Sequence, residues 1–406
     1  MSSIGNTMVL PAKEHRFSPE FTKFLNWALV WVVLANIPFM AMWMVGAPPR
    51  TIPIALAGLV GLIVKRMPRA VQWIAFVGVM VYSLLSFVSG LFSLTLDSLL
   101  YSMQFFAEIK PGNSIEYIAA AIVIVGILIG SWFLLKRDTN FSKPLHILLG
   151  GALIFGLVGA DAAVGEGMRG HYFRPAPAGA IFESAVTKSG FAARADGKRH
   201  LVLIIVESLG VPKNNKAMSD KLFAYYNSSA VKARYEVSQG TSLYYNSTTS
   251  GEMRELCGRW GDYYELLESD DPKTLNCLPA QLAEKGYATQ AMHSFKGPFF
   301  KREDWYPKIG FQKREFAVDL EKRGAEWCGG VFAGACDRQV PKMLAENLKR
   351  AKQPVFQYWL TLNTHLPVPT EQNLHPENCE KVSVELARDY PMICRQFAIF
   401  DDIDKA

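Results

Sequence analysis

The chain has 406 residues, enough for two or three domains of roughly 100–200 residues each. Half of its residues are apolar. The long apolar runs lie before residue 165, and most charged residues lie after it. Of the net charge of +6, +4 belongs to residues 1–163, which hold 11 basic and 7 acidic side chains. The remainder is nearly neutral and has no basic stripe, which excludes nucleic acid as a partner. This distribution predicts a membrane part followed by a soluble part.

Long apolar runs fill the N-terminal part of the chain. They are residues 25–46, 52–64, 70–95, 115–135 and 145–163. A hydrocarbon core of about 30 Å needs about 20 helical residues, so four runs are long enough and 52–64 is short. The first run is too long and too aromatic for a cleaved signal peptide. We therefore predict a domain of five transmembrane helices at residues 1–163.

Basic residues predict the orientation of this domain. Nine lie before the first run or in two alternate connections, and only Arg50 and Lys110 lie in the others. The nine are Lys13, Arg16, Lys23, Lys65, Arg66, Arg69, Lys136, Arg137 and Lys143. The rule places the N-terminus in the cytoplasm and everything after residue 163 outside.

Cysteines agree with this topology, because all six follow the apolar runs. They are Cys257, Cys277, Cys328, Cys336, Cys379 and Cys394. An even set in an exported domain predicts disulfides. Fifteen connectivities are open, of which the pairing of sequence neighbours is one. The alternative, a zinc–thiolate site, lacks any CxxC pair.

The soluble part begins after a linker. Residues 164–198 are rich in Gly, Ala and Pro and show no sustained period, so we predict a juxtamembrane linker there. Residues 199–406 alternate apolar strands with helical segments, which predicts a doubly wound α/β sheet. Glu207, His293 and His365 each end a predicted strand, where sites of such sheets collect.

Two stretches predict a nucleophile beside a cation. Glu207 ends the apolar run LVLIIV, and a carboxylate there is costly unless it is paired or binds a metal. The sequence STTSGE at residues 247–252 predicts a helix N-terminus. A plain N-cap and a salt bridge explain both stretches structurally. Alternatively, a hydroxyl at such an N-terminus, beside a divalent cation, can attack phosphorus or sulfur in an anionic substrate.

These features together resemble the lipoteichoic-acid-synthase-like branch of the alkaline phosphatase and sulfatase superfamily. That branch includes phosphoglycerol transferases, and phosphoethanolamine transferases are close relatives. Its nucleophilic Thr stands in motifs such as GKTSDAE, with a Glu four residues later. Thr248 and Glu252 match that spacing. The resemblance implies that Glu207 is a metal ligand and that Thr248 is both nucleophile and ligand, with Thr249 as the competing nucleophile.

The resemblance also implies substrate-binding residues. In HSFKGPFFKR, His293 and Arg302 match a family His and an Arg nine residues on, although Phe300 replaces the family's Trp. His365, in TLNTHLP, resembles the second substrate His. Core packing of the histidines and a surface position for Arg302 are the alternatives. Asp337 matches a recurrent Asp, but a helix N-cap explains it equally well, so we leave it outside the site.

Two further observations bear on the resemblance: the first argues against a formylglycine sulfatase, and the second leaves the expected metal site incomplete. Cys277 begins CLPAQ, which departs from the C-x-P-x-R pattern of formylglycine sulfatases by its final Gln. The family also completes its metal site with an Asp-His pair, which this sequence lacks up to Ala406. We expect either a truncated form of a longer protein or a chain without half of its ligands, with Zn or Mn incompletely coordinated.

The sequence thus predicts a membrane-anchored phosphotransferase of the bacterial inner membrane, with a periplasmic C-terminal domain. It would move a phosphoglycerol or phosphoethanolamine head group from a phospholipid donor to an envelope glycan or lipid acceptor through Thr248. The alternatives are a phosphodiester or sulfate ester hydrolase of the same superfamily and a truncated, non-catalytic membrane protein.

Overall fold

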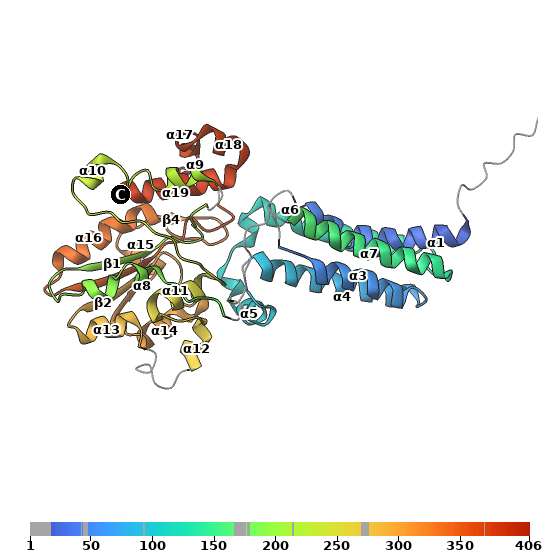
Figure 1. Ribbon diagram of the computed structural model, residues 1–406, viewed down its shortest axis with the longest axis horizontal. Coiled ribbons are helices and arrows are strands. Elements are labelled where there is room, and N and C mark those ends of the chain that lie inside the picture. Colours follow the sequence, from blue (N-terminus) through green and yellow to red (C-terminus); the bar gives the residue numbers. More distant parts are fainter. Residues whose placement is uncertain are drawn as a thin grey trace, which may run out of the picture. The chain divides into compact units, whose positions relative to one another are not determined.

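A computed structural model of the chain describes residues 18–41, 43, 48–91, 94–165, 176, 179–212, 215–268, 276–368 and 370–406. The chain divides into two compact units (Figure 1). One combines Met1–Leu91 with Ala120–His171, and the other combines Phe92–Ala119 with Tyr172–Ala406. The second unit therefore includes the connection between α4 (Arg69–Leu91) and α6 (Ile115–Leu134). The domain bounds expected from the sequence stay a prediction.

The first unit is helical. Its described elements are α1 (Pro19–Ala28), a π-helical segment (Leu29–Leu34), α2 (Ile37–Met40), α3 (Thr51–Val64), α4 (Arg69–Leu91), α6 (Ile115–Leu134) and α7 (Pro144–Gly165). Among the described helices, α4, α6 and α7 are long and apolar enough to cross a membrane. The shorter α3 is equally apolar, and the first predicted run is divided between α1, the π-helical segment and α2. A membrane part is thus supported, and five spans stay a prediction.

Small residues let α3 pack closely in this unit. A Cβ atom on Gly61 would lie 2.3 Å from Cγ of Trp31, and one on Gly58 would lie 2.3 Å from Cγ1 of Ile154. Helix interfaces in membranes favour glycine for this reason. Trp31 is fully buried as a result.

The second unit is built on a parallel sheet with the strand order β1-β6-β2-β3. Its strands are β1 (Leu201–Ile205), β2 (Ala288–His293), β3 (Lys313–Glu315) and β6 (Val355–Leu360); β4 (Trp327–Cys328) and β5 (Gly334–Ala335) form a separate antiparallel pair. Ile205 and His293 both lie opposite Leu360. The carboxyl ends of three strands therefore meet at one edge of the sheet.

Helices cover both faces of this sheet, as the alternation of strands and helices predicted. Their bounds are α5 (Leu96–Ser102), α8 (Ala185–Lys188), α9 (Lys216–Leu222), α10 (Ser229–Lys232), α11 (Thr248–Cys257), α12 (Tyr263–Glu268), α13 (Leu278–Glu284), α14 (Arg302–Lys308), α15 (Ala317–Lys322), α16 (Val340–Arg350), α17 (Cys379–Val382), α18 (Val384–Asp389) and α19 (Pro391–Lys405). Figure 1 shows α13 and α14 on one side of the strands and α15 and α16 on the other.

Alternate side chains of β6 enter two different cores. Phe356 and Tyr358 pack in the core on the side of α11, α13 and α14, whereas Trp359 packs in the core on the side of α15, α16 and α19. All six residues of β6 are buried, as expected for a parallel strand covered on both faces.

The connection between α4 and α6 contributes to the first of these cores. Phe105 is buried there, with its ring centroid 5.7 Å from that of Phe299. The backbone N–H of Lys110 donates to the carbonyl of Val331 at 2.8 Å. These contacts bind the connection to the same unit as the sheet.

Three disulfides join sequence neighbours: Cys257–Cys277, Cys328–Cys336 and Cys379–Cys394. All six cysteines are therefore paired, which confirms the prediction of disulfides. The first disulfide links the end of α11 to the residue before α13.

Candidate active site

Glu207 lies two residues after β1, at the edge where the strands end. Its backbone N–H donates to Oγ1 of Thr361 at 2.9 Å, and Oγ1 of Thr364 donates to its carbonyl at 2.6 Å. The next residue, Ser208, has φ of 52°, a left-handed conformation that is costly for a non-glycine residue. Its hydroxyl donates to Oε1 of Glu207 at 3.2 Å. The sharp turn thus presents a nearly buried carboxylate at the end of the sheet.

Thr248 faces this carboxylate from the first residue of α11. Its Oγ1 donates to Oε1 of Glu207 at 2.7 Å. Asn246, two residues earlier, has φ of 61°, so a second left-handed residue precedes the helix. The free backbone N–H groups of a first helical turn favour an anion. The hydroxyl of Thr248 therefore lies between a carboxylate and a helix N-terminus.

The neighbouring hydroxyls point elsewhere. Thr249 and Ser250 are buried and donate to the carboxylate of Asp262, at 2.5 Å and 3.1 Å. Burial raises the pKa of Asp262, and these hydrogen bonds oppose that rise. The geometry thus separates two threonines that the sequence left in competition, because Thr248 faces Glu207 and Thr249 faces the protein interior.

Glu252 anchors α11 one turn further along. Its carboxylate accepts two hydrogen bonds from Arg302, at 2.9 Å and 2.8 Å, and one each from the phenols of Tyr306 and Tyr358, at 2.5 Å and 3.0 Å. Arg302 is 2% exposed and Glu252 fully buried. Burial lowers the pKa of Arg302, but the Glu252 carboxylate outweighs it and the net shift is upward. Arg302 therefore holds the helix to the core.

His365 reaches the site from the loop after β6. Its Nε2 lies 4.0 Å from Oε1 of Glu207, and its Nδ1 lies 2.6 Å from the carbonyl of Leu366. The ring of Phe332 covers one face of the imidazole, with 4.1 Å between centroids. The structure thus brings His365 next to Glu207, the residue that also accepts the hydrogen bond of Thr248.

His293 occupies the end of β2 and is only 3% exposed. Its Nδ1 lies 3.1 Å from the carbonyl of Leu360. Burial holds the pKa of His293 well below its usual value, and the charge of Arg302 lowers it further. His293 is therefore a neutral imidazole at the same edge of the sheet as the site.

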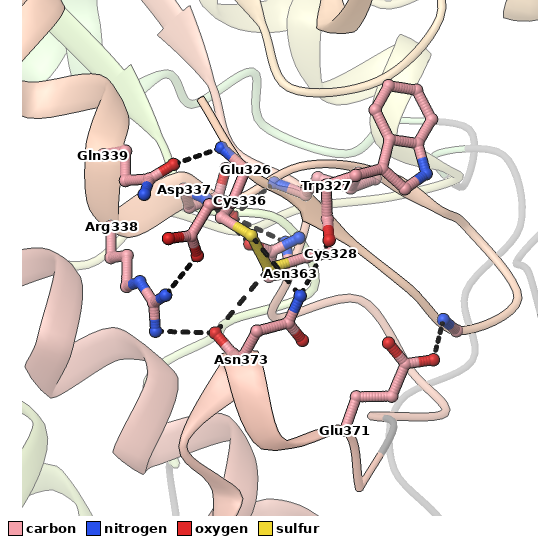
Figure 2. Close-up of a disulfide and its surroundings, with 12 residues drawn as sticks. Glu326, Trp327, Cys328, Cys336, Asp337, Arg338, Gln339, Asn363, Glu371 and Asn373 are labelled. Atoms are coloured by element: carbon pink, nitrogen blue, oxygen red, sulfur yellow. Dashed lines mark hydrogen bonds and ion pairs between the residues drawn. A yellow bond between two sulfur atoms is a disulfide. The ribbon is translucent and has the colours of Figure 1, made fainter. Parts of the chain in front are cut away.

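Asp337 shapes the loop that presents His365. Its Oδ2 accepts the backbone N–H groups of Leu362 and Asn363, at 2.9 Å and 2.6 Å, and its own N–H donates to Oδ1 of Asn363 at 2.7 Å. Figure 2 shows Asp337 and Asn363 beside the disulfide of Cys336. Burial raises the pKa of Asp337 to about 6. Asp337 lies outside the site expected from the sequence, and its match to a recurrent Asp of the family was the available signal.

Gln396 of α19 is a second residue that the sequence analysis missed. Its Nε2 donates to the carbonyls of Ser208 and Thr364, at 2.8 Å each. One amide therefore ties together the loops that follow β1 and β6. A polar residue among the buried apolar positions of an amphipathic helix was the signal for it.

A divalent cation fits part of this geometry. The carboxylate of Glu207 and the hydroxyl of Thr248 are oxygen donors of the kind that such cations bind, and they converge from two separate segments. Across the described ranges, no group of three or more His, Cys, Asp or Glu side chains is arranged to hold a metal. The described donors therefore fit one side of a cation site.

Residues 199–390 match the family model described as Sulfatase. The search of curated proteins finds no match. Among solved structures, a protein of the alkaline phosphatase superfamily from Vibrio parahaemolyticus is 18% identical, with a TM-score of 0.36, over 52% of this chain and 50% of that one. The lipoteichoic acid synthase LtaP from Listeria monocytogenes is 16% identical, with a TM-score of 0.35, over 53% of this chain and 51% of that one. The matched region thus spans about half the length of each structure.

Proposed function

Because residues 199–390 match the Sulfatase family model, we propose that this protein is a phosphotransferase of the lipoteichoic-acid-synthase-like branch. Thr248 would take a phosphoglycerol or phosphoethanolamine head group from a phospholipid and pass it to an envelope glycan or lipid. The observation that supports this proposal is the 2.7 Å hydrogen bond from Thr248 to Glu207 at the N-terminus of α11.

In the first half of the reaction, Oγ1 of Thr248 attacks the phosphorus atom of the head group. The bond from phosphorus to the diacylglycerol oxygen breaks, and diacylglycerol leaves as the alcohol. The head group is then esterified to Thr248. In the second half, a hydroxyl of the acceptor attacks the same phosphorus atom and releases Thr248. Overall, the proton of the Thr248 hydroxyl ends on the diacylglycerol oxygen in the first half, and the proton of the acceptor hydroxyl returns to Thr248 in the second. Glu207 orients the hydroxyl of Thr248 for the first half, because its Oε1 accepts the hydrogen bond of that free hydroxyl.

Two further features favour an anionic substrate here, and a third shapes the site. The first turn of α11 offers backbone N–H groups to phosphate oxygens. His365, half-buried and 4.0 Å from Glu207, would donate to a phosphate oxygen from the opposite side. His293 would remain neutral, since its pKa is lowered, and would shape the edge of the site.

A divalent cation such as Zn or Mn, held by Glu207 and Thr248, would lower the pKa of the Thr248 hydroxyl and favour its attack. We propose that the five predicted spans place the domain at the periplasmic face of a bacterial inner membrane. The apolar helices α4, α6 and α7 support membrane attachment, which keeps a phospholipid donor within reach.

The test uses the full chain, purified in detergent, with head-group-labelled phosphatidylglycerol and phosphatidylethanolamine, Zn or Mn, and an added glycan. Label should move to the glycan in the wild-type protein and stay on the lipid in Thr248→Ala. Release of free head group without transfer would instead identify a hydrolase.

Thr249→Ala and Thr248→Ser serve as the matched variants. Thr248→Ser keeps a hydroxyl and should retain part of the activity. Thr249→Ala removes the hydrogen bond to Asp262, so it should lower the melting temperature more than Thr248→Ala does while sparing the chemistry of the folded protein. Loss of transfer in folded Thr249→Ala, with Thr248→Ala active, would reverse the assignment.

A further inference from the structure

A cavity of about 350 Å³ lies beside the first turn of α11 in the C-terminal unit. Residues 94–98, before and within α5, form one wall, and residues 260–265 form another. Its polar lining residues are Thr95, Ser98, Asn246, Asp262, Tyr264 and Glu265. The volume is at the small end of the range typical of ligand pockets, about 300–1,000 Å³, so the cavity has room for a single small ring.

The cavity adjoins the segment that carries the proposed nucleophile. Asn246, two residues before Thr248, lines it, and so does Asp262, which accepts the hydrogen bond of Thr249. Two independent contacts therefore place the cavity beside the start of α11. A ligand bound there would lie next to the segment from which Thr248 projects.

The lining is unsuited to a phosphate group. None of its described residues is Lys, Arg or His, and two of them are carboxylates. A buried phosphate needs basic side chains or converging N–H groups, and carboxylates repel it. The phosphoryl group and this cavity are therefore separate parts of the site.

The lining suits a neutral polyhydroxy group instead. Two aliphatic hydroxyls, a phenol and an amide supply both donors and acceptors. Trp260 adds an indole ring, which is fixed by edge-on contacts with Phe182 and Tyr245 at centroid distances of 5.0 Å and 5.1 Å. An aromatic platform with surrounding hydroxyls and carboxylates provides apolar contact for a sugar face and hydrogen bonds for its edges.

The two carboxylates of the lining already accept hydrogen bonds from the protein. Asp262 accepts hydrogen bonds from Thr249, Ser250 and the backbone N–H of Tyr263. Oε1 of Glu265 accepts the backbone N–H of Asp262 at 3.1 Å. Both carboxylates can also accept hydrogen bonds from the hydroxyls of a sugar, and ethanolamine is the probe for the alternative, an ammonium ligand.

We propose that this cavity binds a neutral sugar unit and positions one of its hydroxyls beside the start of α11. That the sugar belongs to the acceptor rests on the proposed transferase function; the binding itself does not. The connection between α4 and α6 then has a direct role, because its residues Thr95 and Ser98 complete the subsite.

The test measures binding of methyl glucoside to the full chain in detergent by saturation-transfer NMR, with glycerol and ethanolamine as comparison probes. Methyl glucoside should bind the wild-type protein. Ser98→Leu fills the cavity and should weaken binding by about tenfold or more, and Glu265→Gln should weaken it by a smaller factor. Glu268→Gln, an exposed residue on the same helix outside the lining, is the matched control and should bind as the wild type does.

Unchanged binding in a Ser98→Leu variant that melts at the wild-type temperature would overturn the proposal. So would binding of ethanolamine in place of methyl glucoside, or no binding of methyl glucoside at all. The transferase proposal is tested separately. Sugar binding that is lost in Ser98→Leu, in a protein that never transfers label, would retain the subsite and reject the transferase. Thr248→Ala should abolish transfer and leave sugar binding intact.

Discussion

Two buried carboxylates at α11 differ in their hydrogen-bond partners. Glu207 contacts Thr248, the first residue of the helix, and Glu252 lies one turn further along the helix itself. Glu252 receives four hydrogen bonds from Arg302, Tyr306 and Tyr358. In the part of the chain that the structure describes, the carboxylate of Glu207 accepts hydrogen bonds from the hydroxyls of Ser208 and Thr248, and Nε2 of His365 lies 4.0 Å from it. The carboxylate of Glu252, with all four of its hydrogen bonds from core residues, stabilises the fold. The carboxylate of Glu207, bound by side-chain hydroxyls, is free to exchange a hydroxyl for a substrate or a cation. The comparison motivates the proposed role of Glu207 and Thr248 at the first residue of α11 and a structural role for Glu252 one turn later.

The same comparison distinguishes His365 from Arg302, although the family resemblance assigned both residues to the substrate site. His365 lies 4.0 Å from Glu207, and Arg302 is committed to Glu252. Matching spacing in a sequence therefore does not distinguish a substrate contact from a core ion pair. Burial and partners make that distinction, and mutations can test it.

The largest effect is expected from Glu207→Gln. Gln keeps the size of the side chain but removes the charge that orients Thr248 and would hold a cation, so transfer should fall roughly 10²–10⁴-fold. The melting temperature should change little. Ser208→Ala, which removes only a 3.2 Å hydrogen bond, is the control and should stay within tenfold of the wild type. Full transfer activity of Glu207→Gln would show that Glu207 takes no part in the transfer reaction.

Arg302→Met should act on stability. It leaves Glu252 buried with two phenols and no positive charge, and breaking a buried pair in this way costs about 3–5 kcal/mol. Thermal or denaturant unfolding of the detergent-purified chain measures the loss. Arg388→Met, in an exposed pair with Asp389, is the control and should cost under about 1 kcal/mol. Wild-type stability with lost transfer would restore Arg302 to the substrate site.

His365→Asn should lower transfer roughly 10–100-fold without a matching change in stability, since the imidazole is half-buried beside Glu207 and would donate to the substrate. Steady-state kinetics at varied donor concentration measures it. His375→Asn, at an imidazole paired with Asp402, should leave kcat unchanged. Equal kinetic effects of the two substitutions would remove His365 from the site.

The last prediction concerns stability alone, as a pH dependence from Asp337. Its folded pKa of about 6 lies above the unfolded value of 3.8, so the folded state binds the proton more tightly. Stability therefore falls as pH rises from about 4 to 6, by roughly 3 kcal/mol if Asp337 acts alone. Asp337→Asn should flatten the unfolding free energy across this range. An unchanged slope would contradict the raised pKa.

The ends of the strands could be predicted from the sequence alone. Continuous apolar runs predicted β1 and β6, and parallel strands bring their carboxyl ends together, so Glu207 and His365 were expected to meet. The cysteine count predicted disulfides because an exported domain favours them. These features depend on local composition and on one rule of topology.

The remaining features depend on tertiary contacts that no local pattern encodes. Arg302 is a core residue because α14 and α11 share one hydrophobic core. Its guanidinium is 2% exposed, and the buried carboxylate of Glu252 balances its charge. Asp337 serves as an acceptor for a loop 25 residues away in sequence. The connection between α4 and α6 belongs to the second unit through contacts such as the hydrogen bond from the backbone N–H of Lys110 to the carbonyl of Val331. A hydropathy pattern does not predict such contacts.

The central claim is that Thr248, and not its neighbour, carries the head group during transfer. The most direct test incubates the full chain with phosphatidylglycerol or phosphatidylethanolamine and no acceptor, quenches it in acid and maps modified peptides by mass spectrometry. The account predicts a phosphoglycerol or phosphoethanolamine ester on Thr248, absent from Thr248→Ala. An ester on Thr249, or turnover without any esterified residue, would contradict it.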